Sequence, residues 1–264
     1  MRIITDTHGH LYPDQDPVRL LRGARDRLDD LTRKHHPDET PETTRRVFCL
    51  TERADCAAFH KLSEGSETFS GLTVVRCPAD SEALRVLFPD GPDLWICSGR
   101  QFSTEERIEA LAIGARPDAP DGLPLAETLR IIREADAVAV LPWAAGKWMG
   151  ARGRRIRSLI QDCSNDAFLL GDSSLRPRGG FCGGLLRLGC AKGFRVVAGT
   201  DPLPGPGEEE SAGAYATSLS GDWDDARPAR SLVRLLLDPR TDLIPVGPRN
   251  TPLRFACRWI RARR

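Results

Sequence analysis

Short apolar runs alternate with amphipathic stretches along most of this 264-residue chain, and this alternation constrains the fold more than any other feature. Short runs bounded by turn residues predict strands, whereas apolar residues spaced three and four apart predict helices. The expected strands cover residues 2–7, 47–51, 94–98, 109–113, 137–141, 168–171 and 196–200. The expected helices cover residues 18–33, 125–134, 154–161, 185–192, 227–237 and 253–264. This repeated strand–helix order predicts an α/β fold with a parallel sheet whose two faces are covered.

Two segments interrupt the strand–helix rhythm. Residues 69–93 include "LTVVRC" and "ALRVLFPDG", which predict a hairpin inserted between the second and third strands. Residues 201–214 are rich in Pro, Gly and acidic residues and are typical of a rim loop or lid. We interpret the hairpin as an excursion within the chain, residues 1–264, and not as a separate domain.

The composition sets limits on partners and compartment. The chain has 38 basic and 37 acidic residues, a formal net charge of +1, so we do not expect nucleic acid or an anionic membrane as a partner. Its eight cysteines include no CxxC pair, and several, such as Cys49 and Cys97, lie in apolar runs, which is typical of buried thiols in a reducing compartment. No apolar stretch approaches the roughly 20 residues that span a bilayer. We therefore expect a cytoplasmic protein.

Polar residues stand where the expected strands end. His8 and His10 are two residues apart at the end of the first strand, so both side chains can project the same way and bind one divalent ion. Glu52, Asp172 and Asp201 each follow an apolar run, and the carboxyl ends of barrel strands form one rim. Imidazole and carboxylate ligands suit zinc, manganese or iron. The sequence therefore predicts one metal ion near these five side chains.

Two motifs carry a resemblance to a known group of enzymes. "ITDTHGH" resembles the D-x-H-x-H signature that opens metal-dependent hydrolases on (β/α) barrels, in the amidohydrolase and the polymerase-and-histidinol-phosphatase (PHP) superfamilies. "VVAGTDPLP" resembles the late strand of those enzymes, which ends in a metal-binding Asp, here Asp201. Seven expected strands and a modest length are more similar to the distorted seven-stranded PHP barrel than to an eight-stranded one. The resemblance implies a TIM-like barrel and hydrolysis of a phosphoester.

The chain also departs from the PHP pattern. Asp201 is followed by Pro202 and Leu203, whereas PHP proteins normally have His two residues after this Asp. Mid-barrel strands in both superfamilies usually end in a metal-binding His, yet "VAVLPW" has Leu141 there, and no histidine follows His60. We therefore expect one ion and not a two- or three-metal centre. The alternative is a catalytically inactive PHP-like barrel that serves as a binding or regulatory module.

The expected enzyme is a hydrolase acting on a small anionic substrate. A metal-bound water would be the nucleophile, with Asp201 as general base or last ligand. Lys147, Arg152 and Arg176 follow late strands, where they can hold a phosphate or carboxylate.

Each of these site assignments has a structural alternative. The two aspartates are also favoured as turn caps, Glu52 can pair with its neighbour Arg53, and the arginines of "GARGRR" are typical of a solvated helix start. The basic tail "RFACRWIRARR" gives some support to a nucleic-acid-binding subunit, but it is short and the chain is neutral overall.

Overall fold

The computed structural model describes residues 1–64, 71–179, 183–205 and 207–261, and strands and helices alternate through most of this length. The strands are β1 (Arg2–Gly9), β2 (Thr44–Glu52), β3 (Thr73–Cys77), β4 (Asp80–Leu87), β5 (Leu94–Ser103), β6 (Glu109–Ile113), β7 (Val138–Pro142), β8 (Leu169–Ser173), β9 (Val196–Gly199), β10 (Ala216–Ser220) and β11 (Ile244–Val246). The helices are α1 (Pro17–His35), α2 (Ala58–Glu64), α3 (Leu125–Glu134), α4 (Gly150–Asp162), α5 (Gly184–Ala191), the 3₁₀ helix η1 (Glu208–Ser211), α6 (Pro228–Leu237) and α7 (Pro252–Arg261).

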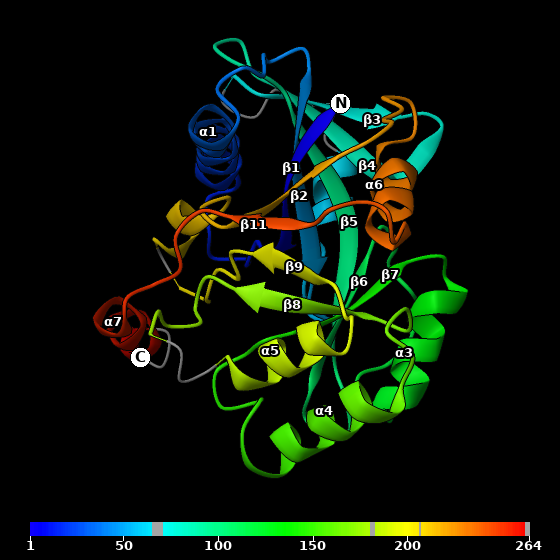
Figure 1. Ribbon diagram of the computed structural model, residues 1–264. Helices are drawn as coiled ribbons and strands as arrows, with labels where there is room; N and C mark the ends of the chain where they lie inside the picture. The colour runs from blue at the N-terminus through cyan, green and yellow to red at the C-terminus, as the bar shows by residue number, and fades with distance from the viewer. Residues whose placement is uncertain (65–70, 180–182, 206, 262–264) are drawn as a thin grey trace.

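The described strands form one curled sheet in the order β11-β10-β1-β2-β5-β6-β7-β8-β9, with the β3–β4 hairpin attached to β5. Helices lie around the outside of this sheet, which is nearly closed into a barrel (Figure 1). The prediction of an α/β barrel is therefore confirmed. Three parts of the expected segments lie outside the described residues: residues 69–70 of the hairpin, residue 206 of the rim loop and residues 262–264 of the last helix.

The expectation of a wholly parallel sheet is wrong. The pairs β1–β2, β2–β5, β7–β8 and β8–β9 are parallel, but β6 runs antiparallel to both β5 and β7. The connection between β5 and β6 spans only residues 104–108, and the Thr104 amide donates to the Ile108 carbonyl within it. So short a connection can form a hairpin but cannot cross over to make a parallel pair. The unexpected strand β10 is antiparallel to β1.

Strand β9 stands at one end of the hydrogen-bonded strand order and reaches β1 through side chains. Gly199 lies so close to His8 that a Cβ there would be 2.4 Å from the His8 backbone nitrogen. Thr7 Oγ1 donates to the Ala198 carbonyl at 3.0 Å, and the Ala198 amide donates to Thr217 Oγ1 at 2.7 Å. These hydroxyl groups satisfy the backbone of β9 where a strand partner would otherwise do so. The ends of β1 and β9 are therefore held side by side.

Three buried apolar clusters attach the helices to the sheet. One joins α1 to β1, β2 and β5 and includes Leu28 and Phe48, and a second joins α3, α4 and α5 to β6, β7 and β8 and includes Ile156. The third joins α6 to those residues of the central strands whose side chains alternate with the ones in the first two clusters. It includes Cys49 and Cys97. These cysteines are fully buried, as their apolar surroundings in the sequence predicted. Among the described helices, none is long and apolar enough to cross a membrane.

Candidate metal centre

The end of β1 places two imidazoles inside the molecule. The pairing of β1 with β2 shifts register between Asp6 and Gly9, a bulge that redirects the side chains at the strand end. His8 and His10 are both only 3% exposed, and their Nε2 atoms lie 3.0 Å apart. Their rings meet edge to face, with centroids 4.8 Å apart. The rings therefore converge on one point and do not point to solvent.

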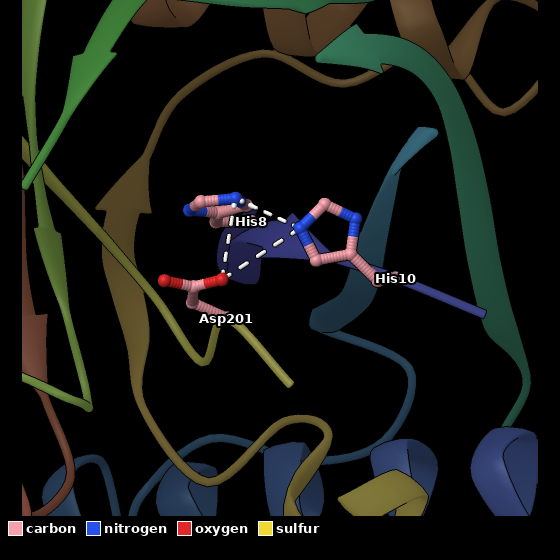
Figure 2. Close-up of side chains that lie close together, drawn as sticks. All are labelled: His8, His10 and Asp201. Atoms are coloured by element: carbon pink, nitrogen blue, oxygen red, sulfur yellow. Dashed lines mark hydrogen bonds and ion pairs between the residues drawn. The ribbon is translucent and has the colours of Figure 1, made fainter. Parts of the chain in front are cut away.

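Asp201, directly after β9 and Thr200, completes this cluster. Its backbone is in the left-handed region, with φ of 55°, and its amide donates to the His8 carbonyl at 2.8 Å. A non-glycine residue adopts this conformation at some cost, which Asp and Asn tolerate better than most side chains. The Ser173 hydroxyl at the end of β8 donates to Asp201 Oδ2 at 3.2 Å. Both contacts hold the carboxylate toward the imidazoles (Figure 2).

The three side chains form the arrangement that a small divalent ion requires. Asp201 Oδ1 lies 3.6 Å from His8 Nε2 and 3.7 Å from His10 Nε2. A point equidistant from these three atoms lies about 2.0 Å from each, which matches zinc–nitrogen and zinc–oxygen bonds of about 2.0 to 2.2 Å. Within the described residues this is the group of histidine, cysteine and acidic side chains whose spacing fits a metal. The donor set and the geometry both fit such an ion.

The protonation states of the cluster also suit a cation. Burial lowers the pKa of His10 below its ordinary value of 6.5, so the ring is neutral at pH 7. Burial alone would raise the pKa of Asp201, but the adjacent His8 and His10 rings and the Ser173 hydroxyl lower it to about 2. The neutral His10 ring and the ionised Asp201 carboxylate then both present lone pairs to an ion.

Asp6 supports the cluster by binding the backbone around it. Its buried carboxylate accepts hydrogen bonds from the backbone amides of His8 at 3.1 Å, Thr200 at 2.8 Å and Gly213 at 2.9 Å. Burial raises the pKa of Asp6 to about 6, against the effect of these donors. The side chain thus connects β1, the residue before Asp201 and the segment after η1. These three backbone contacts explain why the D-x-H-x-H motif has an acidic residue at its first position.

Asp172, at the end of β8, lies outside the cluster. Arg176 binds it through two hydrogen bonds of 2.6 Å, from Nε to Oδ1 and from the terminal nitrogen to Oδ2. The Tyr215 hydroxyl donates to the same Oδ2 at 2.9 Å. The carboxylate is therefore neutralised by a guanidinium four residues later in the chain. Arg176, expected as a substrate contact, is engaged in this pair.

Glu52, at the end of β2, also lies outside the cluster. It is 1% exposed; Oε1 accepts from the Ala58 amide at the start of α2, and Oε2 lies 3.2 Å from a guanidinium nitrogen of Arg116. This last contact is an ion pair without hydrogen-bond geometry. Burial raises the pKa of Glu52, and Arg116 opposes the rise. The surface pair with Arg53 considered from sequence does not form, because Arg53 binds Asp55.

A polar chain that sequence reasoning missed leads from the cluster to Lys147. Gln101 Oε1 lies 3.0 Å from His8 Nε2, and Gln101 Nε2 donates to Glu109 Oε1 at 3.4 Å. Glu109 in turn binds the Lys147 ammonium group. The strand containing Gln101 was expected to end at residue 98, but the hairpin with β6 extends it to Ser103. Arg152, the other expected substrate contact, donates to the Gly146 carbonyl at 2.9 Å.

No protein-family model and no curated protein sequence matches the chain. Among solved structures, PsfC from Pseudomonas syringae PB-5123 is similar over 99% of this chain and 98% of its own length, with 15% sequence identity and a TM-score of 0.58. This likeness shows a shared fold over essentially the whole of both chains.

Two further similar structures are of an endonuclease. The lesion-specific endonuclease PfuEndoQ from Pyrococcus furiosus aligns with 92% of this chain and 58% of its own, at 10% identity and a TM-score of 0.49. Endonuclease Q in complex with a 27-mer duplex substrate bearing an abasic lesion aligns with 89% of this chain and 56% of its own, at 10% identity and a TM-score of 0.45. The expectation against nucleic acid as a partner is corrected here, since the similar solved structures include an endonuclease in complex with a duplex substrate. Net charge alone was an inadequate ground for that expectation.

Proposed function

We propose that this chain is a metal-dependent hydrolase of phosphoesters, with one divalent ion held by His8, His10 and Asp201. The observation that carries the proposal is the convergence of their three donor atoms around a point about 2.0 Å from each. The resemblance of "ITDTHGH" to the PHP signature supports the same reaction class. Zinc, manganese and iron all suit this donor set.

When bound, such an ion would lower the pKa of a coordinated water and polarise the phosphoryl group. The protein's own part is to keep His10 neutral by burial and Asp201 ionised by its neighbours, so that both present lone pairs. A carboxylate with a pKa of about 2 is a weak proton acceptor, which favours the ligand role for Asp201 over that of general base. One carboxylate against a dication leaves a positive centre, which suits an anionic substrate.

Lys147, Arg152 and Arg176 are the proposed substrate contacts. Lys147 is connected to His8 through Glu109 and Gln101, so an anion bound at the cluster would lie at the inner end of this polar chain. Arg176 lies three residues beyond Ser173, which contacts Asp201. Because Lys147 and Arg176 are already paired with Glu109 and Asp172, they would orient the phosphoryl oxygens as hydrogen-bond donors and add little net positive charge.

Metal content tests the proposal before any substrate is known. We expect elemental analysis of the purified chain to find about one zinc, manganese or iron ion per molecule. The double variant His8→Ala, His10→Ala should lose the ion and any hydrolysis of aryl phosphomonoesters and phosphodiesters. His60→Ala is the matched control, because His60 is exposed on α2 and pairs with Glu64. A folded wild-type chain that binds no metal and hydrolyses neither ester with added manganese or zinc would overturn the proposal in favour of an inactive binding module.

A further inference from the structure

The near-neutral net charge conceals a strong segregation of charge along the chain. Residues 141–200 contain ten Lys and Arg but only three Asp, and residues 247–264 contain six Arg and no acidic residue. The rest of the chain therefore holds 22 of the 38 basic and 34 of the 37 acidic residues. A field of one sign over part of a surface attracts an oppositely charged partner whatever the total charge is.

The two basic segments belong to one end of the molecule. The first includes α4, with Arg154, Arg155 and Arg157 exposed, and α5, with Lys192 exposed directly after it. A Cβ at Gly153 would lie 3.8 Å from Leu185, so the two helices pack directly against each other. Figure 1 shows α4 and α5 together at the lower end of the barrel, with α7 at the left edge at about the level of α5.

Backbone contacts join the second basic segment to the first. The Asn250 amide donates to the Ser174 carbonyl at 2.8 Å, and the Arg178 amide donates to the Asn250 carbonyl at 3.0 Å. Arg178 Nε also donates to the Arg249 carbonyl at 2.8 Å. Ser173, which contacts Asp201, directly precedes residues 174–178, so this basic segment begins next to the candidate metal centre. We call the surface formed by α4, α5, residues 174–178 and residues 249–254 the basic face.

Several cations of the basic face lack the acidic partners found elsewhere. Arginines on the rest of the barrel commonly pair with carboxylates, as Arg22 does with Asp90 and Arg45 with Asp225. By contrast, some exposed cations of the basic face have no Asp or Glu oxygen within 4.0 Å in the part of the chain that the structure describes; they are Arg154, Arg157, Arg178, Lys192 and Arg254. Their charge is available to an external anion.

We propose that the basic face binds the phosphate backbone of a nucleic acid and delivers one of its phosphodiesters to the metal centre. A single small phosphoester needs only the few cations beside the ion, whereas cations repeated along a helix match a repeating anion. The 13 residues of α4 extend about 20 Å, the rise of about six base pairs. The delivery step rests on the proposed hydrolase function, but binding by the basic face does not.

The test is binding of the full chain to fluorescent oligonucleotides of about 20 units, measured by anisotropy in EDTA from about 50 to about 200 mM salt. Single-stranded DNA, duplex DNA and single-stranded RNA are separate arms. We expect binding that weakens with salt. Arg154→Ala with Arg157→Ala should weaken it at least about fivefold and lower the salt slope by about 1.5. The matched control is Arg130→Ala with Arg133→Ala, which removes equal charge from exposed positions of α3 and should change affinity less than about twofold.

Three results would overturn this inference: no binding to any oligonucleotide at low salt, equal losses in the α4 and α3 double variants, or binding to vesicles containing phosphatidylserine with none to the oligonucleotides. Because EDTA removes metal, failure of the proposed hydrolase leaves the binding result unaffected. Conversely, suppose that a metal-loaded chain cleaves aryl phosphoesters but binds no oligonucleotide. That result would support the proposed hydrolase function and contradict the proposal that the basic face binds its substrate.

Discussion

Three barrel strands lead to carboxylates with little exposure to solvent, and these carboxylates have two kinds of surroundings. After β2 and β8, Glu52 and Asp172 face the guanidinium groups of Arg116 and Arg176. After β9, Asp201 faces two imidazoles, and burial keeps at least that of His10 neutral. A buried carboxylate is costly unless a cation or hydrogen bonds compensate it. The first two sites already contain their cation, whereas at the third an added metal ion would supply it.

The strongest test of the β9 region is to separate β9 from β1. Gly199→Ala would place a methyl group against the backbone of His8, so we expect a loss of about 3 kcal/mol in the free energy of unfolding. Metal affinity should fall as well, because His8 and Asp201 would move apart. Urea unfolding in EDTA and a metal titration measure the two effects.

Gly184→Ala is the control for that change, since a Cβ at this position in α5 meets nothing within 4 Å. Replacing a helical glycine there should stabilise the protein by up to about 1 kcal/mol. If Gly199→Ala were equally benign, the close approach of β9 and β1 would not be what holds the cluster together.

Removing the cation from the β2 region should affect stability without affecting metal. Arg116→Ala leaves the buried Glu52 carboxylate without its ion pair, and we expect a loss of about 2 kcal/mol, reduced because the pKa of Glu52 is already raised. Arg53→Ala, at an exposed neighbour of Glu52, should change stability by less than about 0.5 kcal/mol. A large drop in metal affinity in Arg116→Ala would instead place Glu52 among the ligands.

The smallest effect concerns pH. Because burial lowers the pKa of His10, the unfolded chain binds a proton below pH 6.5 that the metal-free folded chain does not. This difference should lower the free energy of unfolding as the pH falls through 6.5, whereas the raised pKa of Asp6 should increase it as the pH falls through about 6. Urea unfolding in EDTA at about pH 8 and about pH 5.5 should show a smaller loss for His10→Ala than for wild type, while His60→Ala follows wild type. Identical profiles for all three would show that His10 titrates as an exposed ring.

Sequence reasoning recovered the parts of this fold that local pattern determines. The seven apolar runs became β1, β2 and β5 to β9, and the D-x-H-x-H motif led to His8 and His10 at the end of β1. Strand direction was not recoverable in the same way, since β6 has the apolar pattern of a parallel strand yet pairs antiparallel on both sides. Strand β10, with the mixed sequence "ATSLS", has no strong pattern of its own.

Glu52 and Asp201 depend on partners that are remote in sequence. Asp172 instead combines the local partner Arg176 with the remote Tyr215. Arg116 is 64 residues from Glu52, and Tyr215 is 43 residues from Asp172, so no local motif predicts either contact. Gln101 reaches His8 only because the β5–β6 hairpin extends β5. The basic face was hidden for a different reason: net charge sums the whole chain, whereas binding depends on where the charges lie.

The most direct test of the difference between these regions is a pair of metal titrations on Asp201→Asn and Asp172→Asn. Asn tolerates the left-handed backbone at position 201, so the first variant should fold normally and report on the lost carboxylate alone. We predict that Asp201→Asn weakens binding of zinc or manganese by about 100-fold or more, while Asp172→Asn changes it by less than about threefold. Equal losses in the two variants, or wild-type affinity in Asp201→Asn, would contradict the account.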